Sequence, residues 1–115
     1  MRGLEATHLN GLRSSLISNE ALKPIVIKFI QSLPDRIAEI ARHHQNGDEK
    51  MFFLMVHQLK GAAASFGIST LHQIASNLEC IERSNRDEIE SLIADARSLI
   101  EQIQQVHKKE IHRVD

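Results

Sequence analysis

The sequence predicts an all-α protein: an antiparallel four-helix bundle over about residues 19–107, with an additional N-terminal helix over about 4–17. Apolar residues recur at helical spacing in successive stretches, and no stretch alternates with the period of two that a strand shows. Only two prolines and five glycines interrupt the 115 residues, and most of them fall between the periodic stretches or at their ends. The intervals between these stretches are short, and amphipathic helices joined by short loops bury their apolar faces by antiparallel packing. We therefore expect one domain over residues 1–115.

The first half of the chain contains the least regular elements. The stretch 4–17 is weakly periodic and is expected to pack on the end or side of the bundle. A second helix is expected to begin near Ser18 or Asn19, which are both good N-cap residues. Pro34 is expected to end this helix and to open the next one, because proline suits only the first turn of a helix. That next helix stops before Asn46.

The second half of the chain predicts three helices with clear boundaries. One runs from about Asp48, a good N-cap, to residue 66, and Gly67 closes it. The next starts near Ser69, and a last long helix follows the Ser84-Asn85 loop and ends near Val106. Each carries apolar residues at intervals of three and four, so each presents one apolar face to the bundle.

Composition excludes several classes of function. Cys80 is the only cysteine, which excludes an intramolecular disulfide and a cysteine-rich zinc site and favours a reducing, cytoplasmic setting. No apolar run approaches the roughly 20 residues that span a bilayer, so we expect no direct membrane contact. The net charge of −1 gives no sign of the basic excess that accompanies nucleic-acid binding.

The helix within residues 51–67 has an unusual outer face. At about 100° per residue, its core stripe consists of Phe52, Val56, Leu59 and Ala63 with their neighbours. The opposite side of such a helix normally carries charged residues. Here it carries one histidine among apolar and small residues, with a lysine on its flank: His57, Phe53, Leu54, Gly61, Ala64 and Lys60.

Gly61 lies one turn beyond His57 and calls for an explanation, because a glycine inside a helix costs about 1 kcal/mol relative to alanine. Close approach by another molecule is one explanation. A second is that the helix is buried on both sides and Gly61 serves helix–helix packing. His57 alone would most simply be a solvated or hydrogen-bonded residue.

The same segment resembles the signature of histidine-phosphotransfer (HPt) domains, the phosphoryl carriers of two-component phosphorelays. That signature reads roughly H-x-L-K-G-x-x-x-x-x-G, and the chain has His57-Gln58-Leu59-Lys60-Gly61 followed by Gly67 at the required spacing. One departure is Val56, where alanine often precedes the histidine. The resemblance extends to the proline-containing stretch upstream and to the helix that follows the motif.

The resemblance implies a role for each matching residue. His57 would accept the phosphoryl group, usually on Nε2, and Lys60 would place positive charge near the phosphoryl oxygens. Glu79 falls where the family often has a glutamine or glutamate that bonds the imidazole; its alternative is an exposed helix salt bridge. The docking face for a partner would comprise Phe53, Leu54, Gly61 and Ala64.

The resemblance also implies the partner. It would be the receiver domain of a response regulator or of a hybrid sensor histidine kinase, whose aspartate exchanges the phosphoryl group with His57. The chain has no nucleotide-binding signature or acidic Mg²⁺ cluster, so we expect a carrier rather than an enzyme, with no cofactor of its own and with Mg²⁺ on the receiver. A monomer is the expected state.

Two other functions remain open at this stage. A docking module would use the same exposed face without phosphorylation of His57. A metal site would use some of the seven histidines, but His43 and His44 are adjacent and point apart, and only His107 with Glu110 has a useful spacing. A site usually needs three or four converging ligands. DNA binding has no basic face to support it.

Overall fold

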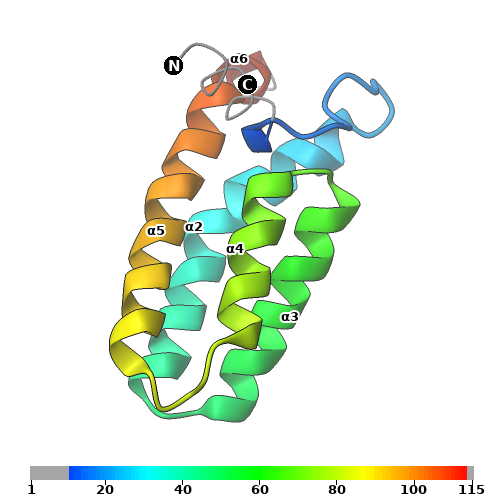
Figure 1. Ribbon diagram of the computed structural model, residues 1–115. Coiled ribbons are helices and arrows are strands. Elements are labelled where there is room, and N and C mark those ends of the chain that lie inside the picture. The colour runs from blue at the N-terminus through cyan, green and yellow to red at the C-terminus, as the bar shows by residue number, and fades with distance from the viewer. Residues whose placement is uncertain (1–10, 114–115) are drawn as a thin grey trace.

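The computed structural model describes residues 11–113, and this part of the chain is helical without strands. Its helices are α2 (Lys23–Gln45), α3 (Glu49–Ser65), α4 (Ser69–Cys80), α5 (Arg86–Val106) and α6 (Lys108–Arg113). The first four of these form an antiparallel bundle in which α3 and α5 each pack on both α2 and α4 (Figure 1). The predicted all-α bundle is therefore confirmed.

The core lies where the apolar stripes of the four long helices meet. The stripe expected on α3 is buried throughout: Phe52, Val56, Leu59 and Ala63. Each other long helix contributes aliphatic residues with no more than 4% of their surface exposed, such as Leu33, Leu78 and Ile93. Burying a side chain of this size stabilises the fold by about 1.5–3 kcal/mol, so this core holds the helices in register.

The boundaries of α3 follow from local chemistry. The Asp48 carboxylate accepts a hydrogen bond from the Met51 backbone N–H at 3.2 Å and caps the first turn. Gly67 ends the helix with φ at +68°, a conformation that residues with a Cβ rarely adopt. A Cβ at Gly67 would also collide with Ser15, whose backbone N–H donates to the Gly67 carbonyl. The tight turn that follows lets α4 begin at Ser69, as the sequence predicts.

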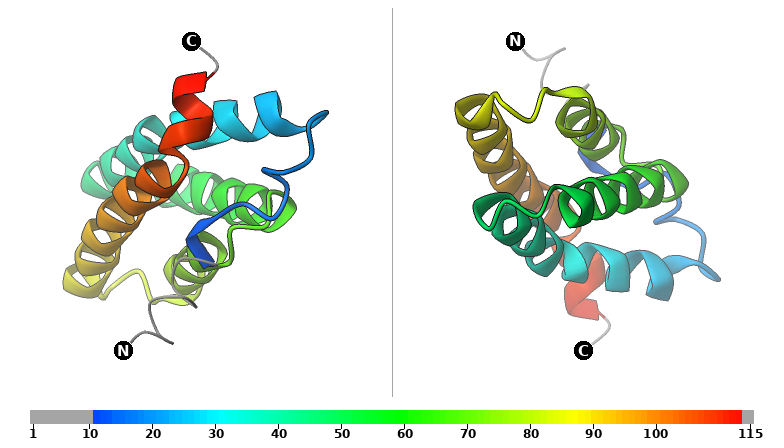
Figure 2. Two further views of the ribbon diagram at one scale, coloured as in Figure 1. Left: turned by 90° about the horizontal axis from the view of Figure 1, so that it is seen from above. Right: turned by 90° about the horizontal axis from the view of Figure 1, so that it is seen from below.

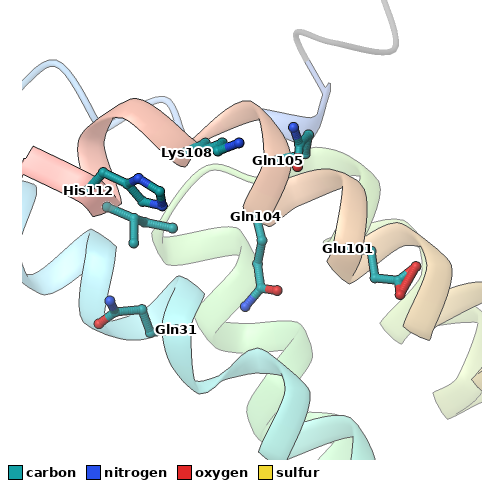
Figure 3. A pocket seen from close by; sticks show the side chains of 7 residues that line it. Gln31, Glu101, Gln104, Gln105, Lys108 and His112 are labelled. Atoms are coloured by element: carbon teal, nitrogen blue, oxygen red, sulfur yellow. The ribbon is translucent and has the colours of Figure 1, made fainter.

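The prediction that Pro34 ends a helix is wrong, because α2 continues through it as one helix of 23 residues. A proline inside a helix removes the N–H that would bond the carbonyl four residues earlier, which here is that of Ile30. Gln104 on α5 replaces the missing donor, with its amide nitrogen 3.3 Å from the Ile30 carbonyl oxygen. The side chain of Gln104 extends from α5 toward α2 in the polar groove between them (Figure 3).

Replacing Gln104 with alanine is expected to lower the free energy of unfolding by about 1 kcal/mol, because the Ile30 carbonyl then loses its side-chain donor. Gln105 is the matched control, since it lines the same groove but is exposed and makes no such bond. Its alanine variant should stay within about 0.5 kcal/mol of wild type. Urea unfolding of the three proteins measures the difference, and equal losses in both variants would contradict this role for Gln104.

The N-terminal helix predicted over residues 4–17 lies partly outside the described residues, namely at 1–10. Over the described part it is wrong beyond residue 12, because residues 13–18 form bends and turns. The Ser14 hydroxyl accepts the N–H of Leu16 and donates to the Phe66 carbonyl. Such side-chain bonds to backbone compete with helix formation, and they attach this segment to the α3–α4 turn.

The start of α2 also differs from the prediction. The helix begins at Lys23 rather than near Ser18 or Asn19. The Asn19 side-chain oxygen accepts the Ala21 N–H at 3.0 Å and forms a turn of its own. Asparagine favours both this turn and an N-cap, so Asn19 indicated an element boundary but not whether a turn or a helix begins there.

His107 separates α5 from the short helix α6, which the sequence did not predict. The His107 side chain has no exposed surface. Its Nδ1 lies 2.6 Å from the Ile103 carbonyl oxygen, and its Nε2 lies 3.0 Å from the Ser14 backbone nitrogen. A carbonyl only accepts and an N–H only donates, so the ring is neutral with its proton on Nδ1. Burial lowers the pKa of His107, despite the bond to Ile103 that raises it.

The neutral ring of His107 predicts a dependence of stability on pH. Its pKa in the folded state lies below the ordinary value of 6.5, so the unfolded chain takes up the proton first. The stabilisation is therefore complete above about pH 6.5 and is lost as the pH falls toward the lowered pKa. We expect the free energy of unfolding to decrease from pH 7.5 to 5.5, and the decrease to shrink in His107→Gln. Urea unfolding at three pH values tests this, and an identical slope in the variant would refute it.

Candidate functional site

One side of α3 is exposed although it carries almost no charge. The structure places His57 at its centre, with 72% of the side chain exposed. Phe53 and Leu54 precede it by one turn and are 38% and 46% exposed, and Gly61 and Ala64 follow it and are also exposed. The imidazole therefore stands clear of the bundle on a surface of apolar and small residues.

The neighbouring helix α4 supplies the hydrogen-bond partner of this imidazole. Because α3 and α4 pack antiparallel, Glu79 near the end of α4 faces His57, and its Oε2 lies 2.7 Å from His57 Nδ1. An ionised carboxylate only accepts hydrogen bonds, so Nδ1 carries the proton. In the neutral ring the other nitrogen, Nε2, then keeps a free electron pair and is chemically able to act as a nucleophile.

Lys60 completes a group of three side chains. Its ammonium lies 2.8 Å from the second oxygen of Glu79, and the two residues form a partly exposed ion pair. The hydrogen bonds from Lys60 and then from His57 lower the pKa of Glu79, while the bond to Glu79 raises the pKa of Lys60. Glu79 is therefore charged near neutral pH and holds both neighbours at once.

Gly61 has no packing role within the described residues. A Cβ built at this position would meet no atom within 4 Å. The explanation that Gly61 lets another helix of the chain approach therefore fails for this part of the protein. The helix carries a residue that costs it about 1 kcal/mol, and the space that this residue leaves open faces solvent beside His57.

A family model described as Hpt domain matches residues 24–109, which is most of the chain and covers all of the bundle except the first residue of α2. The chain belongs to the Hpt domain family. Hpt domains are phosphoryl carriers of two-component phosphorelays that interact with receiver domains and have no nucleotide site of their own. Searches of curated proteins and of solved structures found no significant match.

Arg83 belongs to the surface of this Hpt domain, although sequence analysis did not identify it. Its guanidinium lies 4.3 Å from the centre of the Phe52 ring and 4.5 Å from that of Phe53, within the range of cation–π attraction. It also bonds the Glu49 carbonyl at 3.3 Å. These contacts fix Phe53 at the edge of the exposed face. Arg83 lies in the loop after α4, where no periodic pattern could mark it.

The other histidines in the described part of the Hpt domain are placed differently. His43 and His44 are buried and face different carboxylates: His43 faces Glu39 at 3.6 Å and Asp48 at 3.8 Å, and His44 faces Glu90 at 3.3 Å. His107, expected as a possible partner of Glu110 in a metal site, uses both ring nitrogens for backbone bonds. Within residues 11–113 no group of three or more His, Cys, Asp or Glu residues could hold a metal ion.

No helix within the described residues has the length and apolar character needed to cross a bilayer.

Proposed function

We propose that this Hpt domain carries a phosphoryl group on Nε2 of His57 and exchanges it with the aspartate of a receiver domain. One observation carries the proposal: the His57 side chain is largely exposed, and its Nδ1–H donates a hydrogen bond to Glu79, with 2.7 Å between Nδ1 and Oε2. A fixed tautomer presents an unprotonated nitrogen to a partner without any rearrangement of the ring.

The transfer step follows from this arrangement. The Nε2 electron pair of His57 attacks the phosphorus of the receiver's aspartyl phosphate, and the bond from phosphorus to the aspartate oxygen breaks with its electrons left on that carboxylate. The ring keeps its Nδ1 proton and becomes a positively charged phosphoimidazolium. The Glu79 carboxylate opposes this charge directly, and in the reverse direction the electron pair returns to Nε2.

Lys60 lies one turn along α3 from His57, and Glu79 holds its ammonium on the α4 side of the imidazole. Its positive charge favours the dianionic phosphoryl group at short range. A phosphoryl group on His57 and the Glu79 carboxylate would then both attract Lys60. The domain itself supplies a nucleophile and charge; we expect the receiver to supply the acidic pocket and Mg²⁺. We further propose a cytoplasmic setting and a monomeric carrier.

Incubation with phosphorylated receiver domains tests this function. Purified receivers labelled with ³²P on their aspartates are mixed with the domain, and the label on the domain is followed in time. The proposal predicts label that is lost in acid and kept in base, as a phosphoramidate bond requires. Binding of a receiver without any transfer of label would instead favour a docking module.

Substitutions at Gly61 separate stability from docking. Gly61→Ala should raise the free energy of unfolding by up to about 1 kcal/mol, because alanine is the better helix former and its Cβ meets no atom. Gly61→Leu should leave the bundle folded but slow transfer from a receiver by about tenfold or more, because the partner can no longer approach α3 closely. Thermal unfolding and label transfer measure the two effects. Unchanged transfer in Gly61→Leu would show that the open space has no role in docking.

A further inference from the structure

Arg83 connects the loop after α4 with the first turn of α3. The loop and this turn lie at the same end of the bundle, which is nearest the viewer in the right-hand view of Figure 2. The Arg83 guanidinium donates a hydrogen bond to the Glu49 carbonyl at 3.3 Å, and its Nε lies 3.8 Å from the Glu49 carboxylate. The Arg83 side chain is only 19% exposed. This long charged side chain is therefore held against α3 instead of extending into solvent.

The guanidinium lies in the corner between two phenylalanine rings. Phe52 and Phe53 meet nearly edge to face, with their planes at 74° and their centres 6.1 Å apart. The guanidinium carbon is 4.3 Å from the centre of the first ring and 4.5 Å from that of the second. The two rings differ in their surroundings, because Phe52 is fully buried whereas Phe53 is 38% exposed. Arg83 therefore joins a ring that is fixed in the core to a ring on the face around His57.

Phe53 has few other restraints. Within the described residues, its aromatic and cation–π partners are Phe52 and Arg83. A phenylalanine on a helix surface otherwise exchanges between staggered rotamers, and a partner that binds the ring has to select one of them. A guanidinium that is partly shielded from water attracts a ring more strongly than an exposed one does. Arg83 therefore limits the orientations of the Phe53 ring in the free domain.

We propose that Arg83 is a positioning residue for phosphoryl transfer, because it holds the Phe53 ring in the orientation in which a receiver domain meets it. This inference rests on the proposed function. A ring that is already held needs no ordering when the receiver docks, whereas ordering one such side chain weakens binding by about three- to tenfold. Arg83 then contributes to docking through Phe53 and leaves the chemistry at His57 to other residues.

The placement of Arg83 separates it from the phosphoryl group. Its hydrogen bond is to Glu49, which precedes His57 by about two helical turns, or about 12 Å along the axis. Salt screens exposed charges over about 8–10 Å, and His57 is largely exposed. A direct contact with phosphoryl oxygens would require the guanidinium to leave Glu49 and both rings. Lys60 is the nearer cation, since it shares the Glu79 carboxylate with the imidazole.

Substitution of Arg83 should therefore change one kinetic parameter and leave the others as they are. The probe is the receiver domain that labels wild-type His57 fastest in a panel. In Arg83→Ala we expect the KM for this receiver to rise by about three- to tenfold, with the rate at saturating receiver unchanged. Labelling by phosphoramidate, a small donor that needs no docking, should equal that of wild type. The KM of Arg83→Lys should lie between the two, because lysine keeps the charge but lacks the planar group that covers both rings.

Two comparisons show whether Arg83 acts through Phe53. Arg86→Ala is the control of equal charge change, since Arg86 is exposed at the start of α5, and its KM should stay within about twofold of wild type. Phe53→Ala is the second background, and it raises KM by itself because the receiver loses an apolar contact. In that background Arg83→Ala should have no further effect on KM, because no ring remains to be positioned. This coupling is what a double-mutant cycle measures.

An unchanged KM in Arg83→Ala, an equal rise in Arg86→Ala, or effects of Arg83→Ala and Phe53→Ala that multiply would each overturn the proposal. Slower labelling of Arg83→Ala by phosphoramidate would also overturn it, because the guanidinium would then act on the phosphoryl group itself.

Circular dichroism checks that each variant is folded. If Arg83→Ala is not, Arg83→Gln decides, because its amide can still donate to the Glu49 carbonyl but brings no charge to the rings. Its KM should rise by about threefold, and a wild-type KM would contradict the proposal. If no receiver labels the wild-type domain, the proposed function itself fails and this inference fails with it. That result is distinct from transfer that proceeds with the same KM whether or not Arg83 is present.

Discussion

Replacing His57 with glutamine should reduce phosphoryl acceptance from a phosphorylated receiver to the background level while the bundle stays folded. A glutamine amide nitrogen is not nucleophilic, because its electron pair is delocalised into the carbonyl group. The His57 side chain is 72% exposed and contributes nothing to the core, so the free energy of unfolding should change by less than about 0.5 kcal/mol. Transfer of ³²P measures phosphoryl acceptance, and urea unfolding measures the free energy of unfolding.

His112→Gln is the matched control for this experiment. His112 is an exposed histidine on α6, outside the α3 face, and its variant should accept label at the wild-type rate. Normal labelling of His57→Gln would show that His57 is not the residue that accepts the phosphoryl group. Loss of labelling in both variants would point to a general defect rather than to one nucleophile.

Removing the Glu79 carboxylate should have the second largest effect. In Glu79→Ala the imidazole loses the acceptor that fixes its tautomer, and the phosphoimidazolium loses its counter-charge. We expect transfer to slow by roughly a hundredfold, the lower range for a group that assists a proton or charge in the transition state. The transfer rate of Glu79→Gln should lie between those of wild type and Glu79→Ala, since the amide oxygen can still accept the Nδ1–H but carries no charge. Single-turnover rates at saturating receiver measure this series.

The ion pair between Lys60 and Glu79 predicts that substitutions of these two residues do not act independently on the transfer rate. Lys60→Ala alone should slow transfer by about tenfold, because the phosphoryl oxygens lose one positive charge. Since Glu79 holds Lys60 at 2.8 Å, the double variant should be less impaired than the product of the two single effects. Such coupling between neighbours is what a double-mutant cycle detects. Strictly multiplicative effects would mean that the two residues act independently.

Helix periodicity was enough to predict most of the bundle. The helix α3 begins and ends where Asp48 and Gly67 placed its boundaries, and α4 and α5 begin where Ser69 and the Ser84-Asn85 loop placed them, because these signals are local. The end of α4, at Cys80, lies a few residues before the predicted loop. Pro34 misled the prediction because the loss of one helical hydrogen bond is offset by Gln104, about 70 residues later in the chain. The segment around Ser14 misled it because that side chain bonds the α3–α4 turn. Neither contact can be read from neighbouring residues.

The residues of the site also divide into those that the local sequence indicates and those that only helix packing brings together. The motif on α3 indicated His57, Lys60 and Gly61, since spacing on one helix is a local property. The position of Glu79 came from the family resemblance, and only the packing of α3 against α4 places its carboxylate between His57 and Lys60.

The position of the phosphoryl group on the imidazole tests the central claim most directly. The domain is prepared with ¹⁵N-labelled histidine, phosphorylated by its receiver, and examined by NMR spectra that correlate ring nitrogens with ring protons and phosphorus. Among the seven histidines, we predict phosphorus bonded to Nε2 of His57 alone, with a proton retained on Nδ1. Phosphorus on Nδ1 of His57, or on any other histidine, would contradict the account.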